Sequence, residues 1–116
     1  MLKLEEGLRV YVFTKPCDMR CGFYRLADLV KTTTKANPLS GDLFVFLSRC
    51  RKRIKILYWD KDGYALWYKG LEAGIFRVES LDGYEEITGV DLKELLSGIE
   101  LNRIIFRKKS KTGVYS

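Results

Sequence analysis

The sequence predicts an α+β fold: an antiparallel β-meander of about four to five strands, one helix in the N-terminal half and a short C-terminal helix. Between residues 43 and 79, β-rich segments follow one another closely and are separated by turn-forming residues. Apolar residues at helical spacing occur on both sides of this region, in 18–33 and 91–99. The chain has 116 residues, 47% of them hydrophobic, so we expect one compact core.

The first expected elements are a short strand at Val10 to Phe13 and a helix from Asp18 to about Thr33. Asp18 stands where an N-cap residue would accept hydrogen bonds from the first free N–H groups of the helix. We therefore expect Asp18→Ala to lower stability through loss of the cap. The expected core face of this helix consists of Met19, Phe23, Leu26, Ala27 and Val30.

Four strand candidates follow the loop at residues 37–42. They are Leu43 to Ser48, Ile54 to Trp59, Tyr64 to Lys69 and Ile75 to Glu79. The short connections suit hairpin turns, the second with Gly63 available for a positive φ. Both faces of these strands carry apolar and aromatic residues, so we expect one face to carry the helices and the other to be partly covered or open to a partner. A second helix is expected at Asp91 to Ile99.

The expected organisation is a single domain, residues 1–100, followed by a basic tail, residues 101–116. The longest apolar runs are much shorter than the roughly 20 residues that cross a bilayer, and the first residues lack an apolar signal segment. We therefore expect a soluble, cytoplasmic protein without membrane association. The three cysteines are expected to stay reduced.

Cys17 and Cys21, near the expected helix start, raise the question of a metal or redox site. A zinc site usually needs four ligands, but the chain has no His, and its third cysteine, Cys50, is far away in the sequence. The spacing also differs from the two-residue spacing of the redox motif. We interpret the pair as incidental, and we expect a variant with both residues changed to Ser to fold and function.

Catalytic motifs are absent from the sequence. It has no His, the commonest general base, and no P-loop, GxGxxG or GxSxG pattern. WDKDG resembles part of a calcium loop, but the position that needs a bidentate Glu is Lys69. We expect a non-catalytic protein that needs neither cofactor nor metal. One alternative stays open, a Mg²⁺-dependent nuclease that would use Asp18, Asp60, Asp62 and Glu72.

Positive charge is concentrated in residues 49–55, RCRKRIK, which hold five positive charges and no negative one. Residues 60–99 hold nine acidic and four basic residues. A basic segment of this kind attracts polyanions, of which nucleic acid is the commonest in cells. Its contacts with phosphates would be largely independent of base sequence. The predicted DNA contacts are Arg49, Arg51, Lys52, Arg53 and Lys55, with Arg51, Lys52 and Arg53 reaching outward.

Aromatic residues flank this basic hairpin on the neighbouring strands. They are Tyr58, Trp59, Trp67 and Tyr68. Aromatic rings can stack on unpaired bases, but a place in the core is the favoured interpretation here. A sheet with aromatic residues on both faces could also support a homodimer through an exposed apolar face.

Several stretches between about Gly7 and Glu100 are distinctive in combination: DMRCGFYRLADLV, NPLSGDLFVF, RIKILYWDKDGYALWYKGLEAGIF and LLSGIE. Together they resemble the TnpB accessory protein of insertion sequence 66 family transposons, the product of that element's second reading frame. The resemblance implies a small protein that DNA transposition requires alongside other element-encoded proteins. Cleavage and strand transfer would belong to a separate, larger transposase. Members commonly have Thr in place of Cys17 and Lys in place of Cys21, which argues further against a thiol mechanism.

Two functions are consistent with this resemblance. In the first, the protein is an accessory factor that binds DNA through the basic hairpin. In the second, it is a protein–protein adaptor in the transposition complex, without DNA affinity of its own. The predicted partner surface of the adaptor consists of Asp18, Arg20, Asp60, Lys69 and Glu72. Arg20 and Arg25 are also candidates for phosphate or partner contacts.

Overall fold

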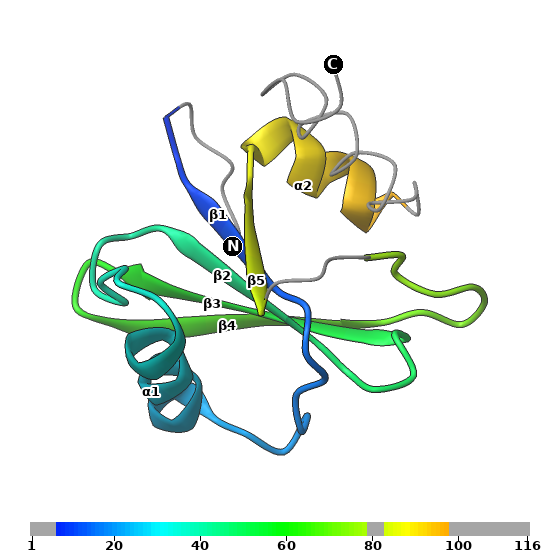
Figure 1. The fold of residues 1–116 in the computed structure, drawn as a ribbon, viewed down its shortest axis with the longest axis horizontal. Coiled ribbons are helices and arrows are strands. Elements are labelled where there is room, and N and C mark those ends of the chain that lie inside the picture. The colour runs from blue at the N-terminus through cyan, green and yellow to red at the C-terminus, as the bar shows by residue number, and fades with distance from the viewer. Residues whose placement is uncertain (1–6, 79–82, 98–116) are drawn as a thin grey trace.

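A computed structural model of the chain describes residues 7–78 and 83–97 (Figure 1). The elements in chain order are β1 (Val10–Phe13), α1 (Phe23–Thr33), β2 (Leu43–Leu47), β3 (Arg53–Asp60), β4 (Gly63–Gly70), β5 (Tyr84–Ile87) and α2 (Gly89–Leu96). The strands form one five-stranded sheet in the order β4-β3-β2-β1-β5. The α+β fold class is therefore confirmed.

The predicted meander is confirmed for β2, β3 and β4, which pair antiparallel as consecutive neighbours. The sheet as a whole is not a pure meander, because β1 pairs with β2 in parallel, with Val12 opposite Val45. A parallel pair needs a crossover connection, and the segment that contains α1 supplies it. The positive φ of the β3–β4 turn lies at Lys61 and not at Gly63, which instead pairs with Asp60 as the first residue of β4.

The strand expected at Ile75 to Glu79 is wrong for residues 75–78, which have no regular structure, and Glu79 lies outside the described residues. The Phe76 N–H donates a hydrogen bond of 2.7 Å to the Arg51 carbonyl, and the Phe76 ring is fully buried. The apolar residues of this segment therefore pack into the core from an irregular segment that is not a strand. The far edge of the sheet is formed by β5, which pairs antiparallel with β1.

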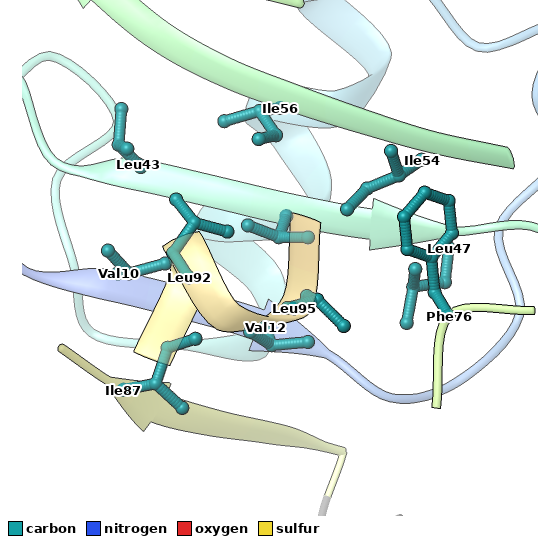
Figure 2. Packing of buried hydrophobic residues seen from close by; sticks show 11 residues of the cluster. Val10, Val12, Leu43, Leu47, Ile54, Ile56, Phe76, Ile87, Leu92 and Leu95 are labelled. Atoms are coloured by element: carbon teal, nitrogen blue, oxygen red, sulfur yellow. The ribbon is translucent and has the colours of Figure 1, made fainter. Parts of the chain in front are cut away.

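The two helices cover opposite faces of the sheet (Figure 1). Leu26, Ala27 and Val30 of α1 pack on one face, where the rings of Phe13 and Phe46 stack with centroids 4.6 Å apart. On the other face, α2 packs through its leucines among the aliphatic side chains of the strands (Figure 2). The expectation of both helices on one face is wrong. All residues of β1 and β2 are buried, so these central strands need a cover on each side.

The start of α1 differs from the prediction: the helix begins at Phe23, with Gly22 as an N-cap that makes no side-chain cap hydrogen bond. Asp18 is not a cap, because its carboxylate accepts a hydrogen bond of 2.9 Å from the Arg20 backbone N–H. Such a local bond stabilises a turn in competition with a helix. Of the five expected core residues, Leu26, Ala27 and Val30 are buried and Met19 packs in part against the same cluster, while Phe23 is 41% exposed.

The second helix begins earlier than predicted, at Gly89, because Thr88 and Asp91 form a capping box. The Asp91 N–H donates to the Thr88 hydroxyl at 3.1 Å, and the Asp91 carboxylate accepts from the Thr88 N–H at 3.2 Å. Residues 98–99 of the expected helix and the predicted tail lie outside the described residues. No helix in the described ranges is both long and apolar enough to cross a membrane.

Candidate nucleic-acid interface

Residues Arg49–Arg53, which contain most of the connection between β2 and β3 and the first residue of β3, form a tight loop that we call the basic turn. Ser48 secures this turn at its base. The Ser48 carbonyl accepts a hydrogen bond from the Arg51 N–H, and its hydroxyl accepts one from the Arg53 N–H, both at 3.0 Å. Arg51 takes a left-handed backbone conformation, with φ of 62°, which lets the chain reverse within so few residues. The backbone of the basic turn is thus held in one conformation.

Three of the five predicted DNA contacts, Arg49, Lys52 and Arg53, have exposed side chains. None of these three cations forms an ion pair with a carboxylate of residues 7–78 or 83–97. Exposed cations on a fixed backbone at one end of a sheet can approach the phosphates of a nucleic acid without rearrangement of the fold.

Arg51 is turned toward the protein, and the expectation that it reaches outward is wrong. Its Nη2 donates a hydrogen bond of 2.8 Å to the carbonyl of Thr14, which follows β1. Burial lowers the pKa of the Arg51 guanidinium. Arg51 therefore joins the basic turn to the end of β1, and its guanidinium is partly buried.

Lys55 is also used inside the molecule. Its side chain is buried, and Nζ donates a hydrogen bond of 2.9 Å to the carbonyl of Cys21. The same ammonium group lies 5.1 Å from the centre of the Tyr68 ring, a cation–π contact with the neighbouring strand β4. Lys55 thus ties β3 to the segment that leads into α1.

Residues of the predicted partner surface do not come together as one site. Lys69, near the end of β4, and Glu72 are exposed next to the basic turn, since the Leu71 N–H donates to the Lys52 carbonyl at 2.8 Å. Asp60 lies at the opposite end of the same two strands, where it pairs with Gly63. The set expected for an adaptor is therefore divided between two ends of the sheet.

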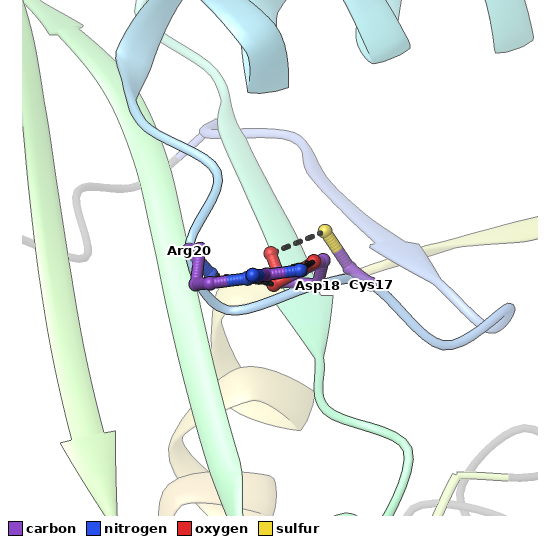
Figure 3. A network of polar contacts seen from close by, with 3 residues as sticks. All are labelled: Cys17, Asp18 and Arg20. Atoms are coloured by element: carbon purple, nitrogen blue, oxygen red, sulfur yellow. Dashed lines mark hydrogen bonds and ion pairs between the residues drawn. The ribbon is translucent and has the colours of Figure 1, made fainter.

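Asp18, Arg20 and Arg25 are the predicted residues that do share a location, a shallow open hollow of about 380 Å³ before α1. The Arg20 guanidinium contacts the Asp18 carboxylate at 2.7 Å (Figure 3). Hydrogen bonds from the Arg20 side chain and backbone lower the pKa of Asp18 to about 2. Asp18 is therefore ionised at neutral pH and offsets the charge of Arg20.

The thiol groups lie near this hollow without forming a reactive site. Cys17 and Cys21 are free and partly buried. Burial, together with the neighbouring Cys21, raises the pKa of Cys17 to about 11, which keeps it protonated at neutral pH. No group of three or more His, Cys, Asp or Glu side chains that could hold a metal ion occurs in the described ranges.

The flanking aromatic residues divide between core and surface. Tyr58 and Trp67 pack in part against the core cluster under α2. Tyr68 is 53% exposed, although Lys55 covers one side of its ring. The sequence reasoning missed Tyr24, which is 80% exposed on α1 and contacts the Tyr64 ring edge-on. Its position beside the core stripe of α1, three residues before Ala27, is the signal that could have identified it.

Fold and surface together define a small α+β protein with a mixed sheet covered by one helix on each face and a basic turn at one end of that sheet. The chain belongs to the IS66 Orf2-like family, whose model matches residues 8–105. The protein is thus an accessory protein associated with transposition of an insertion sequence.

Two relatives from Sinorhizobium fredii are similar over most of their length. The uncharacterized protein y4hO is 41% identical over 101 residues, which cover 86% of this chain and 88% of the relative. The uncharacterized protein y4jC is 34% identical over 105 residues, which cover 90% of each chain. No solved structure matches this chain significantly.

Proposed function

We propose that this accessory protein binds DNA during transposition, and that the exposed cations of the basic turn, Arg49, Lys52 and Arg53, contact the phosphates. The observation that carries the proposal is that the cations of this one segment fall into two groups with different environments. Arg51 and Lys55 are held by carbonyl groups of the protein, whereas their three neighbours are exposed without a carboxylate partner among the described residues. A role in the fold thus accounts for two of the five cations, and the other three are free to bind an anion.

The electrostatics of the basic turn support the same conclusion. Like charges on adjacent residues repel one another, and a bound polyanion relieves that repulsion while it releases its own counterions. Lys69 is not part of this set of cations, because it lies opposite Ile54 on the α2 face, whereas Arg53 is on the α1 face of the sheet. Phosphate contacts do not read base edges, so the binding is largely independent of sequence.

The test is a variant in which Arg49, Lys52 and Arg53 are all changed to Gln, while Arg51 is kept for its structural role. Binding to element-end and random duplexes is titrated at several salt concentrations. We expect the affinity for both duplexes to fall alike, and the slope of log K against log salt to flatten by about 2.7, or about 0.9 per lost phosphate contact. Transposition should fall while the melting temperature stays the same or rises.

A matched control removes the same charge elsewhere: Lys31, Lys35 and Lys93, which are exposed and distant in sequence from the basic turn, are changed to Gln. The control should bind DNA more tightly than the basic-turn variant. Equal binding and equal transposition of the two variants would contradict the proposal. So would a wild-type protein without salt-sensitive DNA binding at low ionic strength, and the adaptor function would then take its place.

A further inference from the structure

We infer that strand β4 is the contact surface for a second copy of this chain, and that the two β4 strands pair antiparallel to join two five-stranded sheets into one. Among the described residues, 7–78 and 83–97, β4 lies at the edge of the sheet and pairs with β3 alone. It is eight residues long, so a long row of backbone N–H and C=O groups faces away from the sheet. Such an edge is a template for another strand.

The two edges of this sheet differ in how they are protected. β5 has four residues, and two of them, Glu85 and Glu86, are charged. Short length and charge are common devices that prevent edge-to-edge pairing. β4 has neither device from Gly63 to Tyr68, where the sequence is GYALWY. Its register with β3 is unbroken over eight pairs, so no bulge interrupts the edge. The structure therefore leaves β4 as the open edge.

The direction of the backbone groups on β4 follows from its pairing with β3. Just after the strand, the Leu71 N–H donates to the Lys52 carbonyl at 2.8 Å. Hydrogen-bonded and non-bonded pairs alternate along an antiparallel ladder, so every second residue before Leu71 also bonds to β3. The residues between them, Tyr64, Leu66, Tyr68 and Gly70, direct their N–H and C=O groups toward the open edge.

Three of these residues, Tyr64, Leu66 and Tyr68, form a self-complementary register. If a two-fold axis passes beside Leu66, then Leu66 lies opposite itself and Tyr64 lies opposite Tyr68 of the second copy. A register centred on Tyr68 would pair as many outward residues, and one centred beside Trp67 would pair all four, but the Trp67 register would place Asp62 opposite Glu72 of the second copy. The Leu66 register also brings Lys69 opposite Gly63, beside the turn that carries Asp62 of the second copy. Charge complementarity thus favours a second copy of this chain as the occupant.

The side chains of β4 agree with a partner on this edge. Tyr64, Leu66 and Trp67 are only partly buried, although equivalent apolar residues of the inner strands are fully buried. Tyr68 is 53% exposed. A second β4 strand would cover these side chains on both faces, because Leu66 and the tyrosines share the α1 face while Trp67 lies on the α2 face.

The test measures mass in solution by light scattering for the wild type, Leu66→Lys and Leu66→Glu. We expect the wild type at twice the 13.5 kDa chain mass and each variant at 13.5 kDa, because like charges would face each other at the axis. Mixing the two variants should restore the double mass, since Lys and Glu would then lie opposite. Far-UV circular dichroism checks that each variant is folded.

A second pair of variants leaves the core untouched, because Asp62 and Lys69 are both exposed. Asp62→Lys and Lys69→Asp should each raise the dimer dissociation constant several-fold, and the double variant should recover in part. A monomeric wild type at the highest soluble concentration would overturn the inference. Unchanged dimers in both Leu66 variants would overturn it as well, because the contact surface would then lie elsewhere.

The basic turn offers an internal control. It lies at one end of the sheet and contains no residue of β4, so the Gln variant of Arg49, Lys52 and Arg53 should keep the wild-type mass. The two proposals can therefore fail independently. A wild-type protein that dimerises without binding DNA would contradict only the proposed function, and one that binds DNA as a monomer would contradict only the dimer.

Discussion

Arg51 and Lys52 are adjacent cations with opposite environments. The Arg51 guanidinium donates to the Thr14 carbonyl, whereas the Lys52 side chain is exposed. A hydrogen bond from a charged donor contributes about 1.5–3 kcal/mol, so Arg51→Ala should lower the free energy of unfolding by about that amount. Lys52→Ala should change it by less than about 0.5 kcal/mol. Urea denaturation measures both, and equal effects would show that the bond to Thr14 contributes nothing.

Two thiols should differ in reactivity for a physical reason. Burial raises the pKa of Cys17 to about 11, while a hydrogen bond with Ser48 lowers the pKa of the exposed Cys50. The thiolate is the reactive form, and its fraction at a given pH rises as the pKa falls. Iodoacetamide at pH 8 should therefore modify Cys50 well before Cys17, as followed by peptide mass spectrometry. Equal rates for the two would contradict this account.

At the level of the element, α1 starts without a side-chain cap. A Cβ atom at Gly22 would meet nothing within 4 Å, and its φ of −96° suits any residue. Gly22→Ser should therefore raise the free energy of unfolding by about 0.5–1 kcal/mol, through a capping hydrogen bond and a less flexible unfolded chain. Thermal unfolding followed by circular dichroism at 222 nm measures the change.

Two variants are controls for this prediction: one at Asp18, where the sequence predicted the start of α1, and one at Thr88, the N-cap of α2. Asp18→Ala should leave the helix content unchanged, because Asp18 bonds to Arg20 and not to the helix. Thr88→Ala should lower the free energy of unfolding by about 1 kcal/mol, since it removes the capping box of α2. Lower helicity in Asp18→Ala, with no gain in Gly22→Ser, would place the helix start at Asp18 after all.

At the scale of the whole molecule, the two proposed surfaces are separate. The basic turn lies at one end of the sheet, and the open edge runs along β4. Two-fold pairing through β4 would direct the two basic turns toward opposite ends of the joined sheet and leave both exposed. The salt titration and the mass measurement therefore test different parts of the protein, while the net charge of +6 affects both through general repulsion between copies.

The parts of the fold that the sequence predicted correctly are those with local signals. The three strands of the meander, their two tight turns and the buried face of α1 at Leu26, Ala27 and Val30 follow from hydrophobic period and turn residues. The capping box at Thr88 was a local signal too, but the prediction began the helix at Asp91. The strand prediction for residues 75–78 was wrong because a short apolar run looks the same in a strand and in an irregular segment that packs into the core.

By itself, the sequence determined the fold class, the family and the position of the positive charge, because composition, period and motif are properties of the chain alone. Only the tertiary structure decided which cations are available. Arg51 bonds to a carbonyl 37 residues away and Lys55 to one 34 residues away, and no local pattern distinguishes them from Arg49 or Lys52. The parallel pairing of β1 with β2 and the open edge of β4 likewise depend on contacts between distant segments, which exist only after the chain has folded.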